Sequence, residues 1–145
     1  GLIPAIEAKI FQDKTPILGI CLGAQLMTRR SDEGEVNGLG WIDGETIAFD
    51  KTKLDAGMKI PHMSWNYVLP KKDCSLFNDM PTNPRFYFVH SYHLKMDLSE
   101  NEWLSVNYGY EFCAAYQKDN IYACQFHPEK SHKYGMALMK NFINL

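Results

Sequence analysis

The 145-residue sequence lacks the features that mark several large classes of protein. Its four cysteines form no Cys-x-x-Cys pair, so neither a zinc site nor a redox motif is indicated, and no metal is expected. Its longest nearly apolar run, 16–26, contains two glycines and is too short for a membrane-spanning helix of roughly 20 residues. Fifteen basic residues against seventeen acidic ones give no excess of positive charge for binding nucleic acid.

The sequence also shows no charged segment followed by an apolar stretch near its first residue, Gly1, which would indicate secretion. With 46% hydrophobic residues and no repeat or linker, residues 1–145 are expected to form one domain with a buried core. Cysteines without partners are typical of a reducing compartment. We therefore predict a cytoplasmic protein in which three of the four thiols lie in the core.

The hydrophobic pattern predicts a large sheet combined with helices. Apolar positions at helical spacing predict helices over 2–12, over 22–30 and after Ser131, a residue type that suits an N-cap. Short apolar runs predict strands at 16–20, 41–49, 63–69, 85–90, 103–108, 112–117 and 121–126. The run at 16–20 is apolar throughout, as expected of a strand buried on both faces.

A nucleophile motif lies where the strand at 16–20 meets the next helix. The segment Gly19-Ile20-Cys21-Leu22-Gly23-Ala24-Gln25 places a cysteine between two glycines, as in a nucleophile elbow with Cys in place of Ser. Glycines are expected there because side chains would clash in so tight a turn. The helix start would lower the pKa of the Cys21 thiol, and the Leu22 N–H would donate to an oxyanion. The alternative is a buried cysteine at an ordinary strand-to-helix turn.

A second motif, Gln125-Phe126-His127-Pro128-Glu129-Lys130, ends the strand at 121–126. A cysteine nucleophile needs a base, and the base needs a group that orients it. His127 can take the thiol proton and pass it to a leaving amine, while Glu129 can hold the imidazole tautomer and stabilise its charged form. Because the sites of open α/β sheets gather at the carboxyl ends of strands, we expect Cys21, His127 and Glu129 to form a catalytic triad.

Through these two motifs the sequence resembles the class I, triad-type glutamine amidotransferases. Further segments, 31–34, 38–40, 61–66, 86–92 and 125–131, are similar to the glutaminase subunits of imidazole glycerol phosphate synthases. The resemblance implies a flavodoxin-like α/β sandwich with a central, mostly parallel sheet. It also implies that Cys21 attacks the side-chain amide of L-glutamine and forms a glutamyl thioester that is then hydrolysed, with His127 as acid and base, Glu129 orienting His127, and no cofactor.

The resemblance implies a glutamine-binding role for five further residues. Gln25 and Glu33 would hold the amino-acid end of the substrate, Glu33 by pairing with its α-ammonium group. His90, Ser91 and Tyr92 follow a strand and would line the glutamine pocket. Without the resemblance, Glu33 is interpreted as a solvated loop acid and Tyr92 as an aromatic residue that only packs.

The resemblance also implies a partner, a cyclase subunit with a (β/α)8-barrel fold that receives the ammonia and forms imidazole glycerol phosphate and AICAR in histidine biosynthesis. The two subunits would form a heterodimer with Trp65, Asn66 and Lys130 at the interface. An exposed Trp suits an interface anchor, whereas Trp65 taken alone would be a core residue. Ser64 stands where the family more usually has glycine, so a related subunit that supplies ammonia to a sugar amidation pathway is an alternative.

Family members begin with further βα units, including a Pro-Gly loop that supplies a second oxyanion N–H, and no such loop precedes Cys21. The chain is therefore interpreted as an amidotransferase domain, residues 1–145, truncated at the N-terminus by about 60 residues at ordinary element lengths. Two other functions stay open on the sequence alone. One is a noncatalytic domain that only binds its partner. The other is a cysteine hydrolase or peptidase on a related fold, which leaves Gln25 and Glu33 unexplained.

Overall fold

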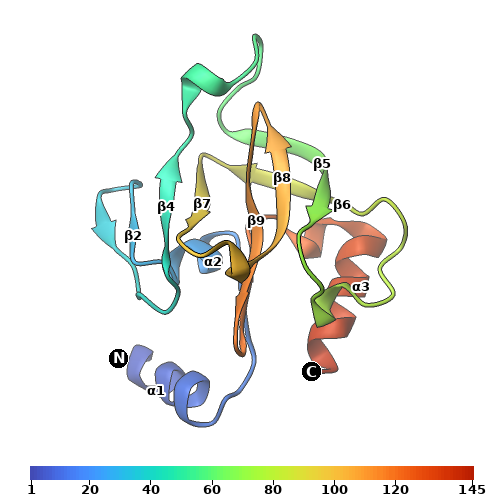
Figure 1. Cartoon of the computed structure of the whole chain (residues 1–145). Helices are drawn as coiled ribbons and strands as arrows, with labels where there is room; N and C mark the ends of the chain where they lie inside the picture. Colours follow the sequence, from blue (N-terminus) through green and yellow to red (C-terminus); the bar gives the residue numbers. More distant parts are fainter.

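Ten strands form one sheet in the computed structural model, which describes residues 1–145 (Figure 1). In chain order they are β1 (Ile17–Ile20), β2 (Arg30–Ser31), β3 (Val36–Asn37), β4 (Gly44–Ala48), β5 (His62–Pro70), β6 (Arg85–His90), β7 (Tyr92–Met96), β8 (Glu102–Tyr108), β9 (Tyr110–Lys118) and β10 (Ile121–Cys124). The α-helices are α1 (Ile3–Glu7), α2 (Leu22–Leu26) and α3 (His132–Ile143), and a π-helical turn, η1 (Ala8–Gln12), continues α1. Short 3₁₀ turns are η2 (Lys51–Lys53), η3 (Ser75–Phe77), η4 (Ser99–Asn101) and η5 (Pro128–Lys130). None of these helices has the length and apolar character that a bilayer crossing needs.

The α/β class is confirmed, but the expected mostly parallel sheet is wrong. The strand order is β3-β2-β4-β7-β9-β8-β5-β6, and β10 joins β9 to β1. Only the β1–β10 and β2–β4 pairings are parallel, and the other seven are antiparallel. The connections explain this difference: β8 and β9 are separated by Gly109 alone, and β9 and β10 by Asp119 and Asn120. So short a connection reverses the chain, whereas a parallel neighbour needs a crossover of about a dozen residues or more.

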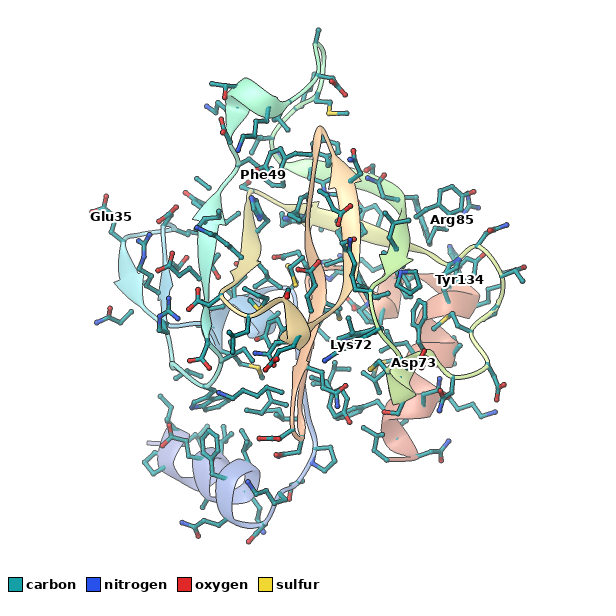
Figure 2. All side chains as sticks on the ribbon, in the orientation of Figure 1. Glu35, Phe49, Lys72, Asp73, Arg85 and Tyr134 are labelled. Carbon is teal, nitrogen blue, oxygen red and sulfur yellow. The ribbon has the colours of Figure 1, made fainter.

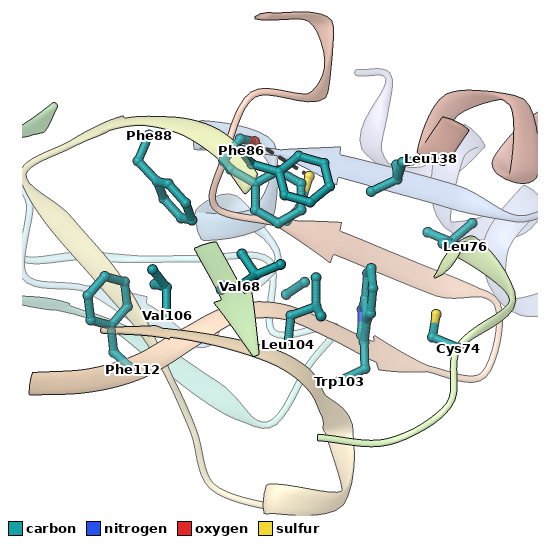
Figure 3. Packing of buried hydrophobic residues seen from close by; sticks show 14 of the residues in the cluster. Val68, Cys74, Leu76, Phe86, Phe88, Trp103, Leu104, Val106, Phe112 and Leu138 are labelled. Carbon is teal, nitrogen blue, oxygen red and sulfur yellow. Dashed lines mark hydrogen bonds between the residues drawn. The ribbon is translucent and has the colours of Figure 1, made fainter. Parts of the chain in front are cut away.

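Side chains on the two faces of the sheet build two separate cores. Neighbouring residues of β10 face opposite sides, with Tyr122 in the larger core and Ala123 in the smaller one. Helix α3 contributes Leu138 to the larger core, where side chains from β5, β6, β8 and β9 pack together (Figure 3). The turn η1 contributes Ile10 to the smaller core. Helices therefore cover both faces of the sheet, which is the layered α/β arrangement that the sequence predicts.

The helix predicted over 22–30 is wrong beyond Leu26, where α2 ends. The Thr28 hydroxyl donates to the Gln25 carbonyl oxygen at 2.7 Å, and the Leu39 N–H donates to the Leu26 carbonyl oxygen at 2.7 Å. These donors satisfy carbonyl groups that a longer helix would satisfy internally, so the chain is free to turn into β2. The predicted strands are confirmed within a few residues, and so are the predicted helical segments at both ends of the chain.

Ser131 lies at the start of α3, but its side chain does not cap the helix as predicted. The Ser131 hydroxyl donates to the His127 carbonyl oxygen at 2.6 Å and accepts the Tyr87 N–H at 3.0 Å. The first turn of α3 therefore packs closely against the segment that carries His127. Gly135 makes this contact possible, because a Cβ atom there would overlap the Pro128 carbonyl oxygen.

Gly135→Ala is expected to lower the free energy of unfolding by roughly 3 kcal/mol, because the added methyl group fits only if α3 moves away from residues 127–131. Chemical denaturation measures this loss. Met136→Ala is the matched control, since Met136 is 71% exposed and its replacement should change stability by less than about 0.5 kcal/mol. A Gly135→Ala variant as stable as the unmodified protein would contradict the close packing of α3.

Candidate active site

Cys21 has the strained backbone of a nucleophile elbow. Its φ and ψ angles are 48° and −104°, a combination that residues other than glycine rarely adopt. It joins β1 to α2, and its N–H donates to the Cys124 carbonyl oxygen at 2.8 Å. Gly19 is required here, since a Cβ atom would lie 2.9 Å from the Ala24 nitrogen. Gly23 is not, because a Cβ atom there meets nothing within 4 Å, so the expected clash exists at only one of the two glycines.

The Cys21 side chain is a thiol that needs activation. Partial burial raises its pKa, and the Leu22 N–H and the Gln125 amide, which hydrogen-bond to the sulfur, offset only part of this rise. The lowered pKa expected from the helix start is therefore wrong. The physical reason is that burial, which is set by the whole fold, outweighs the lowering that the Leu22 N–H at the start of α2 supplies. A thiol of raised pKa requires a base before it becomes nucleophilic at neutral pH.

His127 is oriented as such a base. Its Nδ1 hydrogen-bonds to Glu129 Oε1 at 2.6 Å, and its backbone N–H donates to the Tyr87 carbonyl oxygen at 2.9 Å. Because Glu129 accepts, Nδ1 carries the hydrogen, and the buried Nε2, which has no hydrogen-bond partner, presents a lone pair. Glu129 and Lys130 are close enough to Cys21 for the first to raise and the second to lower the thiol pKa. The fold therefore brings the two sequence motifs together and leaves one imidazole nitrogen free to accept a proton.

Gln125 is a site residue to which the sequence analysis assigned no role. It is fully buried, its Nε2 donates to Cys21 Sγ at 3.7 Å, and its Oε1 accepts from Gln25 Nε2 at 3.1 Å. The thiol also contacts the Val89 carbonyl oxygen, at 3.9 Å. A polar side chain at the buried end of an apolar strand must find partners, and this was the sequence signal that could have identified Gln125.

A cavity of about 250 Å³ opens beside the elbow. Its lining includes Leu22, Gln25 and Glu33, which the sequence analysis assigned to the oxyanion or to the substrate, together with Ser31 and Asn37. Gln25 is buried, whereas Glu33 is exposed. The roles of these three residues stay predictions; they line one cavity next to the start of α2.

The segment 90–92 contacts this region through its backbone. The Tyr92 carbonyl oxygen accepts from Gln25 Nε2 at 3.0 Å. His90 is 6% exposed, and its ring nitrogens bond to His62 and to the Tyr92 carbonyl oxygen, so its ring is occupied within the protein. Ser91 is exposed between β6 and β7. The His90 ring therefore has no free nitrogen with which to bind glutamine.

Strand β5 presents a row of large side chains to the surface: Met63, Trp65, Tyr67 and Leu69. Trp65 is 37% exposed, stacks on the His132 ring at 5.4 Å between centroids, and lies 5.8 Å from the Arg85 guanidinium. A hollow of about 640 Å³ surrounds it, on the side of the molecule where Figure 2 labels Arg85 and Tyr134. We call this surface the Trp65 face; it consists of Trp65, Arg85, His132, Lys133 and Tyr134.

The other two predicted interface residues lie near the Trp65 face but differ in exposure. Lys130 is exposed at the end of η5, close to the start of α3. Asn66 is half-buried, and its amide nitrogen donates to His62 Nε2 at 3.1 Å and to the Asn107 carbonyl oxygen at 3.3 Å. Two of the three residues are thus available at the surface, while Asn66 is engaged in the interior.

Known proteins resemble the chain along its length. The sequence model of the family described as glutamine amidotransferase class-I matches residues 2–145. The imidazole glycerol phosphate synthase subunit HisH 2 of Methanococcus maripaludis is 50% identical, over 99% of this chain and 69% of its own length. The protein of the same name from Pseudomonas aeruginosa is 42% identical, over 100% of this chain and 70% of its own length. A solved glutamine amidotransferase structure from Thermotoga maritima, 19% identical, has a TM-score of 0.60 and matches 97% of this chain and 50% of that one, which is a likeness of fold.

Proposed function

The chain belongs to the class-I glutamine amidotransferases, and on this premise we propose that it hydrolyses L-glutamine to glutamate and ammonia at Cys21. It is the glutaminase subunit of an imidazole glycerol phosphate synthase, an enzyme of histidine biosynthesis. Relatives that are 37–50% identical to this chain, over 99–100% of its length, carry the name of this subunit. One observation supports the catalytic role most directly. The elbow residue Cys21, with its positive φ, accepts a hydrogen bond from Gln125, two residues before His127, whose Nδ1 bonds to Glu129 and whose Nε2 is unpaired.

The first half of the reaction transfers the glutamyl group to sulfur. His127 Nε2 takes the thiol proton as Sγ attacks the side-chain carbonyl carbon, and the Leu22 N–H donates to the oxyanion that forms. His127 then gives the proton to the amide nitrogen as the C–N bond breaks, which releases ammonia and leaves a thioester. Glu129 stabilises the charged imidazole between these two transfers.

The second half frees the enzyme. His127 removes a proton from a water molecule whose oxygen attacks the thioester carbonyl carbon, and the Leu22 N–H again binds the oxyanion. The C–S bond then breaks, the proton moves from His127 to the departing sulfur, and glutamate leaves. The thiol is restored, and atoms and protons balance over the cycle.

The amino-acid end of glutamine binds in the cavity beside the elbow. Glu33 supplies a carboxylate for the α-ammonium group, and Gln25 lies on the buried side of the same cavity. The 90–92 segment contributes through the Tyr92 carbonyl oxygen, which Gln25 contacts at 3.0 Å. A free amino acid carries one cation that needs a carboxylate, and Glu33 is the acidic residue of this lining.

Ammonia passes to a cyclase subunit with a (β/α)8-barrel fold, and the two chains form a heterodimer. The Trp65 face supports this docking, because it combines a partly exposed tryptophan with cationic side chains, the composition of an interface hot spot. Lys130 follows Glu129 directly, so a partner that contacts Lys130 is also next to the triad. All four cysteines are free thiols, which fits a cytoplasmic complex.

Ammonia release from glutamine, measured with and without the cyclase subunit and its ligand, tests this function. Activity is expected to rise when both are added, because docking can align an oxyanion donor. Trp65→Ala should weaken the affinity for the cyclase subunit by roughly 30-fold or more, the loss of a hot-spot tryptophan, and Lys130→Ala should weaken it less. Titration calorimetry measures both losses.

Lys140→Ala, at an exposed position of α3 outside the Trp65 face, is the matched control and should leave the affinity unchanged. Absence of ammonia release under all conditions would contradict the glutaminase function. Ammonia release that no cyclase subunit alters would instead contradict the partner.

A further inference from the structure

A row of hydrogen bonds crosses the interior from β5 toward the Cys21 sulfur. It begins at Asn66, whose amide nitrogen donates to His62 Nε2 at 3.1 Å. His62 Nδ1 bonds to His90 Nε2 at 2.9 Å, and His90 Nδ1 bonds to the Tyr92 carbonyl oxygen at 2.8 Å. His62 is fully buried and His90 is 6% exposed, so every ring nitrogen in the row is paired inside the protein.

The row fixes one tautomer for each histidine. The Asn66 amide nitrogen only donates, so His62 Nε2 accepts and His62 Nδ1 carries the hydrogen. His90 Nε2 then accepts, and its Nδ1–H donates to the Tyr92 carbonyl oxygen, which only accepts. The Asn107 carbonyl oxygen, which only accepts, fixes the orientation of the Asn66 amide, since Asn66 Nδ2 donates to it at 3.3 Å. The Ser64 hydroxyl then donates to Asn66 Oδ1 at 2.9 Å. The two ends of the row therefore agree on one direction of donation.

Both histidines of the row are neutral. Burial lowers the pKa of His62 to about 4 and that of His90 to about 3. Aromatic rings surround them: His62 stacks on Phe88 and Tyr108, with centroids 4.9 and 4.0 Å away, and Phe49 lies 5.4 Å from His90. No group of three or more His, Cys, Asp or Glu side chains is arranged to hold a metal ion. The row therefore ends, without any charge or metal ion, on the Tyr92 carbonyl oxygen.

The Tyr92 carbonyl oxygen connects the row to the reacting sulfur. It also accepts from Gln25 Nε2 at 3.0 Å, and the same nitrogen donates to Gln125 Oε1 at 3.1 Å. Gln125 Nε2 in turn donates to Cys21 Sγ at 3.7 Å, a bond that lowers the thiol pKa. The direction in which the Gln125 amide presents its N–H therefore depends on Gln25, and the position of Gln25 depends on Tyr92.

We propose that His62 and His90 are positioning residues for the glutaminase reaction, which act through the Tyr92 carbonyl and Gln25 to keep Gln125 as a donor to the Cys21 thiolate. The proposal rests on the proposed function of Cys21. A donor held on the sulfur stabilises the thiolate that attacks the substrate, whereas a freely rotating amide would also present its oxygen and repel it.

His93 provides a matched comparison within the same aromatic cluster. It is 3% exposed, and its ring lies 4.9 Å from that of Phe49 and 4.7 Å from that of Phe112. Its Nε2 bonds to the Tyr110 hydroxyl at 2.8 Å, and neither of its nitrogens contacts the row that leads to Cys21. Replacing His93 therefore removes a buried histidine of similar surroundings without changing the row.

The experiment has two readouts. The first is the Cys21 thiol pKa, obtained from the pH dependence of alkylation by iodoacetamide, which mass spectrometry follows on the Cys21 peptide. The second is kcat and KM for glutamine, measured with the cyclase subunit. His90→Phe fills the same space and makes neither hydrogen bond. It should raise the thiol pKa by roughly half a unit to one unit and lower kcat/KM about tenfold. His90→Asn, which keeps a donor near the Nδ1 position, should restore most of both values. His93→Phe should leave both unchanged, although it loses stability.

A double-mutant cycle shows whether the effect passes through Gln125. In a Gln125→Leu background, which has no donor to the sulfur, His90→Phe should raise the thiol pKa no further. If His90→Phe does not fold, Asn66→Leu breaks the row at its half-buried end and should raise the thiol pKa in the same direction. Three results would overturn the proposal. The first is an unchanged thiol pKa in folded His90→Phe or Asn66→Leu. The others are an equal shift of the thiol pKa in His93→Phe, and a full additional shift in the Gln125→Leu background. Alkylation reports on the row without glutamine, so a protein that releases no ammonia would contradict the proposed function separately.

Discussion

Cys21→Ala is expected to abolish glutamine hydrolysis, with a fall in kcat of about 10⁴-fold or more in an ammonia-release assay with the cyclase subunit. Among the four cysteines, Cys21 alone has a strained elbow backbone, and the Leu22 N–H and the Glu129 charge both act on its thiol. Alanine removes the nucleophile and keeps the Cβ atom, so the cavity that binds glutamine should persist. Retained glutamine binding by calorimetry, together with lost turnover, would identify a nucleophile rather than a structural thiol.

A glutamine-analogue electrophile should label Cys21 and leave the other three thiols unmodified, as read by peptide mass spectrometry. Cys74, Cys113 and Cys124 are buried, and burial raises the pKa of each thiol, in the last two well above its ordinary value. Such thiols react slowly because the thiolate is scarce and access is poor. Cys74→Ala is the control and should keep normal turnover. Equal labelling of Cys113 or Cys124 would count against the elbow as the reactive site.

The catalytic motifs could be predicted from the sequence because each is local. The elbow depends on a glycine two residues before Cys21, where the fold leaves no room for a Cβ atom. The His127–Glu129 hydrogen bond joins residues two positions apart on a single turn. These steric and hydrogen-bonding requirements involve residues only two positions apart, so a short stretch of sequence reveals them before any tertiary structure is known.

The antiparallel pairing of most strands, and the existence of strand β7, could not be predicted in the same way. In β7, His93 and Leu94 are both buried, so the alternation that marks a half-buried strand is interrupted. The His93 ring is accommodated by the Tyr110 hydroxyl from another strand, a partner that local sequence does not reveal. Pairing is decided between distant segments, and the sequence shows only which segments are available to pair.

The surroundings of the sulfur also depend on distant residues. Gln125 and Cys21 are 104 positions apart, and His62 and His90 are 28 positions apart. The family resemblance implies a glutamine-binding role for His90, whereas tertiary packing buries its ring in the core. The raised pKa of Cys21 has the same origin, since burial by the whole fold outweighs the lowering that the Leu22 N–H supplies.

Glu129→Gln is expected to lower kcat by about 10²–10⁴-fold and to leave the fold intact. Glu129 accepts the His127 Nδ1 hydrogen at 2.6 Å, and its side chain is 50% exposed, so it contributes little to stability. Glutamine keeps the shape but removes the charge that stabilises the imidazolium. Its amide nitrogen can also donate to Nδ1, which would move the ring hydrogen to Nε2 and leave no lone pair for the thiol proton. KM should change little, because Glu129 does not line the cavity beside the elbow.

This expectation is checked by steady-state kinetics and circular dichroism on Glu129→Gln, His127→Ala and the double variant. Glu100→Gln is the matched surface control. The double variant should be no slower than His127→Ala, because Glu129 acts through His127. The thiol pKa separates this role from a direct charge effect. Since the Glu129 charge raises the pKa of Cys21, Glu129→Gln should make the thiol more acidic while turnover falls. A more acidic thiol with slower turnover identifies orientation of His127 as the function of Glu129, whereas normal turnover in both single variants would contradict the triad.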